Sequence, residues 1–586
     1  MLLEQSELSS RRLNGNIVNG LTWKRPGIWP TWKVVEQAQL SQSHFEYLGL
    51  IAMTENITGR GEPAVHVPKI NHVLCIVSST SHYTELLLHE FQAQRYLQQL
   101  NGVSHLLITK EFGRKPFTRC TDNTGPSYAL APMKYLSPPL CALRAIYGAG
   151  SGFERTAFYR MFDAYGRQNL FTFAGTRQHA ERKKLLAHAY SKSVILSPNA
   201  IARPLIEKNV SKYLELLERE KGLAEEIFQS LHWFSLDSIT GFLYGDKYGG
   251  THAVAGNKEH RQLIGDIIDP SRRKLSWYAT HLKIYTKWLY TRTGMMERFI
   301  TSLGLLPMEK PATYTGIRAH ALQSWTAFEA AAVESAPTQE FAIIEKLWKQ
   351  SKSGKGTRLD GLDMASELAD HFLAGIDTTS DTLMFTIWAL SRGENRKYQE
   401  KLIDEVSKIS EIDCNDDGNP TAEAVDKLPY LDAVIKETLR LYAPLPASEP
   451  RSLPAHTTID GYTIPAGTVV SMSPYTLHRN PEVFPEPLKF KPERWLGETG
   501  DLTEMKKWFW AFSSGGRMCI GLHLAMAEMT TLLAGIYRRY TTSEYKRQRG
   551  SSPVITSRFE VFYDETLPKA EVSTPIARVR HESLDN

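Results

Sequence analysis

Five cysteines are spread through the 586 residues, and no two of them stand close enough to form a CxxC metal pair. They are Cys75, Cys120, Cys141, Cys414 and Cys519. Their odd number and wide spacing argue against a disulfide framework and favour a reducing compartment. If one of them binds a metal, it does so as the only protein ligand. Cys519 is the candidate, because the segment FSSGGRMCIG from Phe512 to Gly521 fits the pattern F-x-x-G-x-R-x-C-x-G.

A second pattern, AGIDTT from Ala374 to Thr379, lies inside a long segment without proline. Gly and two adjacent Thr are poor choices in the middle of a helix, costing roughly 0.5 to 1 kcal/mol each relative to Ala. Threonine hydroxyls can bond back to an i−4 carbonyl or accept a water, and such insertions bend helices. A helix widened here, with the Asp377 carboxylate and the Thr378 hydroxyl, is suited to proton delivery. The alternative is an ordinary helix with exposed Asp and Thr.

Two further pairs have the spacing of neighbours on one helix face. Glu437 and Arg440 form an ExxR motif, and most such pairs are solvated surface bridges worth under about 1 kcal/mol. His179 and Lys183 stand four residues apart in a basic segment. The alternative for this second pair is a solvated basic face without a ligand.

The segment around Cys519 resembles the haem-thiolate signature of the cytochrome P450 monooxygenases. The AGIDTT segment lies about 140 residues before the cysteine, where that family has its oxygen-activation sequence. The resemblance covers about residues 125 to 565, and its details look most like fungal members that tailor secondary metabolites.

The resemblance implies a haem b whose iron is bound by the Cys519 thiolate. Backbone N–H groups and the dipole of a helix starting near Gly521 can stabilise that anion. Gly515 and Gly521 would let the backbone turn tightly and approach the flat macrocycle. Arg517 would pair with a haem propionate, and Phe512 would pack against the ring. The alternative, a buried structural thiol, is the usual role of a lone cysteine.

The remaining site assignments also follow from the resemblance. Thr378 is implied to be the hydroxyl that supports oxygen activation and a water chain, and Asp377 the adjacent acid of the proton relay. His179, Lys183 and Arg451 are implied to meet haem propionates. Lys183 stands where arginine is commoner and lacks its bidentate fork.

A buried structural triad is implied for Glu437, Arg440 and Arg494. It would hold the segment that carries Cys519. Arg494 belongs to the sequence PERW, in which Trp495 replaces the phenylalanine usual in the family.

The elements that position these residues are mostly helical. Long proline-poor segments from Ala142 to about Tyr442 predict helices, and Asp363 to Arg392 would form one helix roughly 45 Å long. Thr457 to Met472 predicts a small sheet, and Gly521 to Tyr540 another helix. The expected fold class is mainly α with small β-sheets (α+β). By resemblance it is the cytochrome P450 fold, with a long central helix over a buried haem.

Composition and organisation narrow the function classes. Hydrophobic residues make up 42% and charged residues 23%, which excludes a disordered or fibrous protein, and a net charge of +5 calls for no nucleic-acid surface. We expect an atypical N-terminal extension over residues 1–120, a cytochrome P450 domain over 121–565 and a polar tail over 566–586. The early apolar runs are far shorter than the roughly 20 residues of a membrane-spanning helix.

The resemblance implies a monooxygenase that inserts one oxygen atom of O2 into an apolar organic molecule. Electrons would come from NADPH through a separate reductase, because no Gly-rich dinucleotide fingerprint follows a strand. Basic residues either face that reductase or serve only solubility: Arg182, Lys183, Lys184, Lys506 and Lys507. The cytoplasmic face of the endoplasmic reticulum is expected by family analogy, through peripheral association. The alternatives are an O2-independent haem-thiolate isomerase or dehydratase, and an inactive haem-binding homologue.

Overall fold

The structure is a computed structural model of the chain. It describes residues 8–13, 16–21, 33–35, 50–52, 139–219, 227–268, 315–334, 342–352, 359–446, 449–459, 461–543 and 577–578. The chain divides into one unit of Met1–Arg114 with Gly294–Pro307 and another of Lys115–Thr293 with Met308–Asn586. The domain boundaries predicted near residues 120 and 565 lie outside the described residues.

In the first unit the structure describes two antiparallel strand pairs. Strand β1 (Leu8–Leu13) pairs with β2 (Asn16–Leu21), and β3 (Lys33–Val35) pairs with β4 (Leu50–Ala52).

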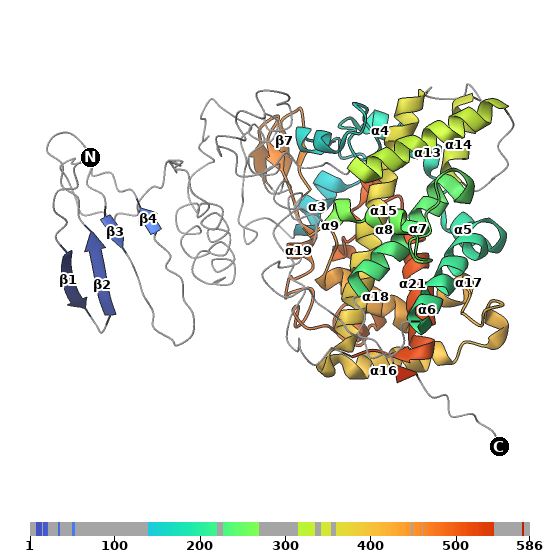
Figure 1. The fold of residues 1–586 in the computed structure, drawn as a ribbon. Helices are drawn as coiled ribbons and strands as arrows, with labels where there is room; N and C mark the ends of the chain where they lie inside the picture. The colour runs from blue at the N-terminus through green and yellow to red at the C-terminus, as the bar shows by residue number, and fades with distance from the viewer. Residues whose placement is uncertain are drawn as a thin grey trace, which may run out of the picture. The chain divides into compact units, whose positions relative to one another are not determined.

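The second unit is mainly helical and contains every residue to which the sequence assigns chemistry (Figure 1). Its α-helices are α3 (Pro139–Tyr147), α4 (Thr176–Leu186), α5 (Lys192–Ile195), α6 (Lys208–Arg219), α7 (Ile227–Tyr248), α8 (Lys258–Gln262), α9 (Gly265–Ile268), α13 (Thr315–Glu334), α14 (Ile343–Lys352), α15 (Gly361–Ser391), α16 (Arg396–Ser407), α17 (Ala422–Val425), α18 (Pro429–Leu441), α19 (Pro474–Leu477), α20 (Leu502–Trp508) and α21 (Leu522–Arg539). Shorter turns are the 3-10 helices η1 (Ala157–Phe162), η3 (Gly393–Asn395), η4 (Glu411–Asp413), η5 (Pro492–Leu496) and η6 (Gly515–Arg517), and the π-helix η2 (Pro198–Glu207).

Small antiparallel sheets complete this unit. Strands β5 (Glu154–Arg155), β6 (Arg451–Ser452) and β9 (Val469–Val470) form one sheet. Strand β7 (Thr457–Ile459) pairs with β8 (Tyr462–Ile464), and β10 (Tyr540–Thr541) with β11 (Ala577–Arg578). The mainly helical class with small sheets, predicted from the sequence, is confirmed.

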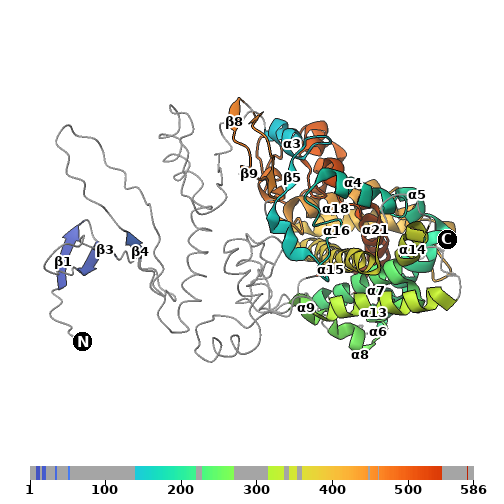
Figure 2. The ribbon, with the colours of Figure 1, turned by 90° about the horizontal axis from the view of Figure 1, so that it is seen from above.

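Helix α15 is the central element of this unit. Figure 2 shows α7 and α13 on one side of it and α18 and α21 on the other, and α15 packs against all four. Its N-terminus is closed by a capping box, in which Asp363 N–H donates to the Asp360 side chain at 2.7 Å and Asp360 N–H to the Asp363 side chain. The predicted single long helix is confirmed, with bounds of Gly361–Ser391.

The widening predicted around AGIDTT is wrong, because α15 is α-helical at every residue. The Thr378 hydroxyl donates to the Ala374 carbonyl at 2.8 Å without interrupting the helix. Glycine occurs at position 375 for a different reason. A Cβ at this position would lie 2.5 Å from Ile239 Cγ1 of α7, so glycine permits the close approach of two helices.

A buried ion network joins α18 to η5. Glu437 Oε2 accepts from Arg440 Nε at 2.8 Å and Oε1 from Arg494 Nε at 3.0 Å, and all three side chains are 0% exposed. The Trp495 indole donates to Oε2 at 3.0 Å, and the Lys491 backbone N–H donates to Oε1 at 2.8 Å. The predicted Glu437–Arg440 pair therefore lies inside the protein, and the Glu437 carboxylate is fully hydrogen-bonded.

Arg440 extends this network toward the cysteine segment. Its guanidinium also donates to the carbonyls of His478, Pro487 and Lys489. The His478 ring bonds the Arg440 carbonyl through Nδ1 and accepts the Trp510 backbone N–H through Nε2 at 2.8 Å. Burial, followed by nearby arginines, lowers the pKa of His478 to about 3, which keeps this acceptor neutral.

Removing parts of this network should give graded losses of stability. Arg440→Ala leaves a buried carboxylate short of its charge partner, so we expect a loss of about 3 to 5 kcal/mol and little folded protein. Trp495→Phe removes one neutral donor and should cost about 1 kcal/mol. Denaturant unfolding and the yield of folded protein measure both effects.

Lys436→Ala is the control, because Lys436 lies on the same helix in a half-exposed bridge to Asp432. It should change stability by less than about 1 kcal/mol. An Arg440→Ala protein as stable as this control would show that the network does not hold the fold.

Candidate active site around Cys519

The cysteine segment is held in a tight loop by its backbone. Cys519 N–H donates to the Phe512 carbonyl at 2.9 Å. Two residues between them are left-handed, Ser513 with φ of 58° and Gly515 with φ of 63°. A Cβ on Gly515 would also lie 2.3 Å from the Tyr147 carbonyl oxygen, so only glycine fits at that position.

The sulfur lies at the N-terminus of α21. Burial raises the pKa of the Cys519 thiol, while the backbone N–H groups of Gly521 and Leu522 and the Lys183 ammonium act in the opposite direction. The chain turns at Gly521 as predicted, but its φ of −81° is open to any residue, so the turn itself does not require glycine. A Cβ there would meet only Cys519 Sγ, at 3.9 Å.

The Cys519 side chain has solvent-accessible surface although it is surrounded by protein. Helix α15 shows the same property, since from Met364 to its end it is buried except for one face. We call the residues of this face the α15 strip: Asp370, Leu373, Ala374, Asp377 and Thr378. Accessible surface at both places fits a large planar group between elements of the unit.

Positive charge gathers beside the cysteine loop. The Arg517 guanidinium donates to the carbonyls of Phe173 and Ala174, both at 2.6 Å. Burial, then repulsion from Arg155 and Arg451, lowers the pKa of Arg517 to about 9. Arg155 and Arg451 are paired opposite each other on β5 and β6. The buried Arg155 Nε has no hydrogen-bond partner within the described part of the chain, so the site suits anionic groups such as two propionates.

Two of the predicted propionate residues lie on α4, next to this charge. His179 is buried, and burial followed by the charge of Arg517 lowers the pKa of its ring to about 2, so it is neutral. Lys183 Nζ donates to the carbonyls of Gly516 at 3.0 Å and Met518 at 2.8 Å. Lys183 thereby fastens α4 to the cysteine loop.

Two other arginines are already paired with carboxylates. Arg451 is 1% exposed, pairs with Glu449 at 2.9 Å and donates to the Tyr159 hydroxyl at 2.6 Å. Arg182, expected at a reductase surface or on a solvated face, is buried and pairs with Glu367 of α15. That expectation is wrong for Arg182, because its charge is used inside the protein.

The acid and hydroxyl of AGIDTT both belong to the α15 strip. His232 of α7 lies behind them, with Nε2 at 3.9 Å from Asp377 Oδ1. The His232 Nδ1–H donates to the Phe228 carbonyl at 2.7 Å, and the ring is 1% exposed. Sequence reasoning missed Arg155, His232 and His478, because a single His or Arg without a motif has no local signal.

Comparison with known proteins decides the family. A family model described as Cytochrome P450 matches residues 142–559. The chain belongs to the cytochrome P450 family. It is 26% identical to cytochrome P450 monooxygenase orf2 of Aspergillus niger over 73% of this chain and 80% of that protein. It is 29% identical to cytochrome P450 monooxygenase stcB of Emericella nidulans over 71% of this chain and 74% of that protein.

Membership in the P450 family defines the cofactor and reaction class. P450 proteins use a haem with cysteine thiolate ligation, and the fungal relatives are named as monooxygenases, so this chain is an oxidoreductase. Electrons from NADPH through a reductase are the family norm. Within the described residues, none of the helices combines the length and apolarity that a membrane span requires.

Glu528 is a buried acid on α21, the helix that begins just after Cys519. It is 3% exposed, and its Oε1 has no hydrogen-bond partner within the part of the chain that the structure describes. Burial raises its pKa from 4.5 to about 8. The folded protein therefore carries Glu528 protonated at neutral pH.

This raised pKa predicts a pH dependence of stability. Between about pH 4.5 and 8 the folded state keeps a proton that the unfolded state loses, so Glu528 makes stability fall as pH rises through that window. Glu528→Gln, which stays neutral, should have a higher Tm relative to wild type at pH 8 than at pH 5. Scanning calorimetry at both values measures the difference. Glu423→Gln changes an exposed acid on α17, so its Tm should depend on pH in the same way as the Tm of the wild type. The same dependence in Glu528→Gln would contradict the raised pKa of Glu528.

Proposed function

We propose that Cys519 binds the iron of a haem b and that the protein inserts one oxygen atom of O2 into an apolar small organic molecule. The reaction would be a tailoring step in fungal secondary metabolism, with electrons from NADPH through a separate reductase. The observation that carries this proposal is the exposed Cys519 thiol, which receives two backbone N–H groups at the N-terminus of α21 and lies beside an excess of positive charge. Peripheral association with the endoplasmic reticulum rests on family analogy alone.

The residues present fit the haem. Cys519 would bind the iron, Arg517, Arg155 and His179 would face the propionates, and Phe512 would pack on the ring. Lys183 would act at one remove, because its ammonium holds the cysteine loop. When bound, the haem supplies the activation of O2, which a thiolate ligand favours by donating electron density.

The chain's own part in the chemistry is proton delivery. Asp377 would hold a proton on the α15 strip, and Thr378 would orient a water with its hydroxyl. Thr378 is partly accessible, and the 18% exposed Asp377 side chain lies 3.9 Å from His232 Nε2, a position that supports this role. It also favours a monooxygenase over an isomerase or dehydratase, which would not need the pair.

The thiolate assignment has a spectroscopic test. Reduced wild-type protein exposed to CO should show the red-shifted Soret band of thiolate-bound haem, and Cys519→Ala should lose it, because the substitution removes the sulfur that would bind the iron. Cys414→Ala, which removes a half-buried thiol bonded to the Ser410 carbonyl, should keep the band. Retention of the band in Cys519→Ala would disprove the assignment.

The proton-delivery role is tested by coupling. With reductase and a substrate that the wild type turns over, Thr378→Ala should consume NADPH but release hydrogen peroxide in place of much of the product. Asp377→Asn should lower product formation by about a hundred-fold, because an amide does not relay a proton as a carboxylate does. The measured quantity is product formed per NADPH consumed.

Thr382→Ala is the matched control. Its hydroxyl bonds back to an i−4 carbonyl as that of Thr378 does, but it is buried and lies off the α15 strip. Its coupling should equal that of the wild type. Equal coupling in Thr378→Ala would instead support a relay through the substrate or an isomerase.

A further inference from the structure

Glu449 is a carboxylate that joins the cysteine loop to the arginines of the candidate haem site. Its Oε2 atom accepts a hydrogen bond from Arg451 Nη2 at 2.9 Å and another from the Ser513 hydroxyl at 3.2 Å. Arg451 belongs to β6, whereas Ser513 belongs to the loop that leads to Cys519. The Glu449 side chain is 14% exposed, so its charge is screened far less than that of a surface acid.

The backbone fixes Glu449 in this place. Its N–H donates to the Met472 carbonyl at 3.1 Å, and its own carbonyl accepts from the Tyr147 hydroxyl at 2.5 Å. That hydroxyl in turn accepts the Met472 backbone N–H at 2.9 Å. The carboxylate therefore has a defined position in the folded chain.

Ser513 is a residue that needs such a partner. Its φ of 58° is left-handed, a conformation that a residue with a Cβ keeps only when its surroundings hold it. Its N–H donates to the Trp510 carbonyl at 3.1 Å, and its hydroxyl donates to Glu449. Glu449 thereby steadies the loop between Phe512 and Cys519.

Glu449 also changes the charge of the site. Arg155, Arg451 and Arg517 lie close enough for their charges to act on one another. Both terminal nitrogens of Arg451 are engaged, Nη1 by the Tyr159 hydroxyl at 2.6 Å and Nη2 by Glu449. Arg155 and Arg517 instead donate to backbone carbonyls, and these two guanidinium groups match two propionates in number. Pairing with Glu449 thus compensates the third positive charge.

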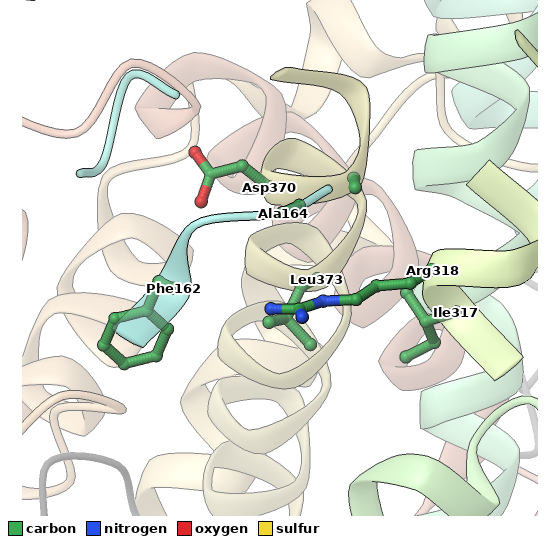
Figure 3. A pocket seen from close by; sticks show the side chains of 7 residues that line it. Phe162, Ala164, Ile317, Arg318, Asp370 and Leu373 are labelled. Carbon is green, nitrogen blue, oxygen red and sulfur yellow. The ribbon is translucent and has the colours of Figure 1, made fainter. Parts of the chain in front are cut away.

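Asp370 of the α15 strip is a second acid near these arginines, since its charge acts on Arg155. It lines a small hollow with Phe162 and Arg318, and Figure 3 shows its carboxyl pointing away from Arg318. In the part of the chain that the structure describes, Asp370 forms no ion pair with an arginine, whereas Glu449 does. Glu449 is therefore the acid whose charge is tied to this cluster by a bond.

We propose that Glu449 is a positioning residue that holds the cysteine loop and, through Arg451, lowers the reduction potential of the haem iron. Reduction adds one electron, supplied by the reductase, and a carboxylate fixed beside the site disfavours the added negative charge. Without that carboxylate Arg451 is uncompensated and favours the reduced form. Charge and hydrogen bonding around a haem are among the factors by which a protein sets its potential. This inference rests on the proposed function, because it requires haem at Cys519.

The test is a potentiometric titration of haem-loaded, full-length protein without substrate. Glu449→Gln removes the charge, while its amide oxygen can still accept from Arg451 and Ser513. It should shift the reduction equilibrium about ten-fold toward the reduced form, a rise of ~59 mV for a one-electron couple. Glu449→Leu, a second neutral variant, should shift it in the same direction. Glu400→Gln, at an exposed acid of α16, should leave it unchanged.

Two further variants separate the charge from the hydrogen bond. Ser513→Ala removes the bond to the loop and keeps the carboxylate, so its potential should stay close to that of the wild type. Its loop should loosen, which faster transfer of haem to apomyoglobin would measure. Glu449→Gln combined with Arg451→Gln removes both charges and should return the equilibrium most of the way to the wild-type value.

Three results would overturn the inference. The first is an equilibrium in the two neutral Glu449 variants that equals the wild type or moves toward the oxidised form. The second is a double variant shifted as far as Glu449→Gln, which would exclude action through Arg451. The third is haem transfer from Ser513→Ala at the wild-type rate, which would exclude the hold on the loop. If the wild type shows the CO spectrum of thiolate-bound haem, these results refute the role of Glu449 alone, whereas absence of that spectrum refutes the proposed function.

Discussion

The buried carboxylate of Glu437 is the contact on which the cysteine site depends. It accepts hydrogen bonds from two arginines, an indole and a backbone amide, in a place where its side chain is wholly excluded from solvent. An uncompensated charge there would cost several kcal/mol, so α18 and η5 must assemble together. Through Arg440 and His478 the same network reaches the Trp510 backbone, where the loop toward Cys519 begins. The thiol is thus positioned by a carboxylate 82 residues earlier in the chain.

On the cofactor side of the site, by contrast with the compensated Glu437 carboxylate, the positive charges are not balanced by carboxylates of the protein. Arg155, Arg451 and Arg517 repel one another, and only Arg451 has a carboxylate partner, Glu449, in the structure as described. A group bearing two propionates would relieve this repulsion. Any ligand that binds only the folded state also stabilises it. Haem binding and folding should therefore be coupled, with the Glu437 network and the cofactor each supporting the loop from a different side.

The substrate side is governed by α15. From Met364 onward this helix is buried except at the α15 strip, which carries Asp377 and Thr378. One element thus carries the groups that would deliver protons at the proposed reaction site. This division leaves the oxidation itself to the cofactor, while the chain supplies position, charge and exclusion of water.

The sequence by itself determined the features that arise within a few residues. The loop pattern around Cys519 indicated the thiolate ligand and the family, and the absence of proline in Asp363 to Arg392 indicated the long helix. Tertiary structure decided what depends on distant partners. Gly375 proved to serve packing against Ile239, Arg182 to pair with Glu367, and Arg155 to lie opposite Arg451. Helix periodicity and turn conformation are set by residues up to about four positions away. Burial and the charge balance of a site depend on segments hundreds of residues apart, which no local pattern contains.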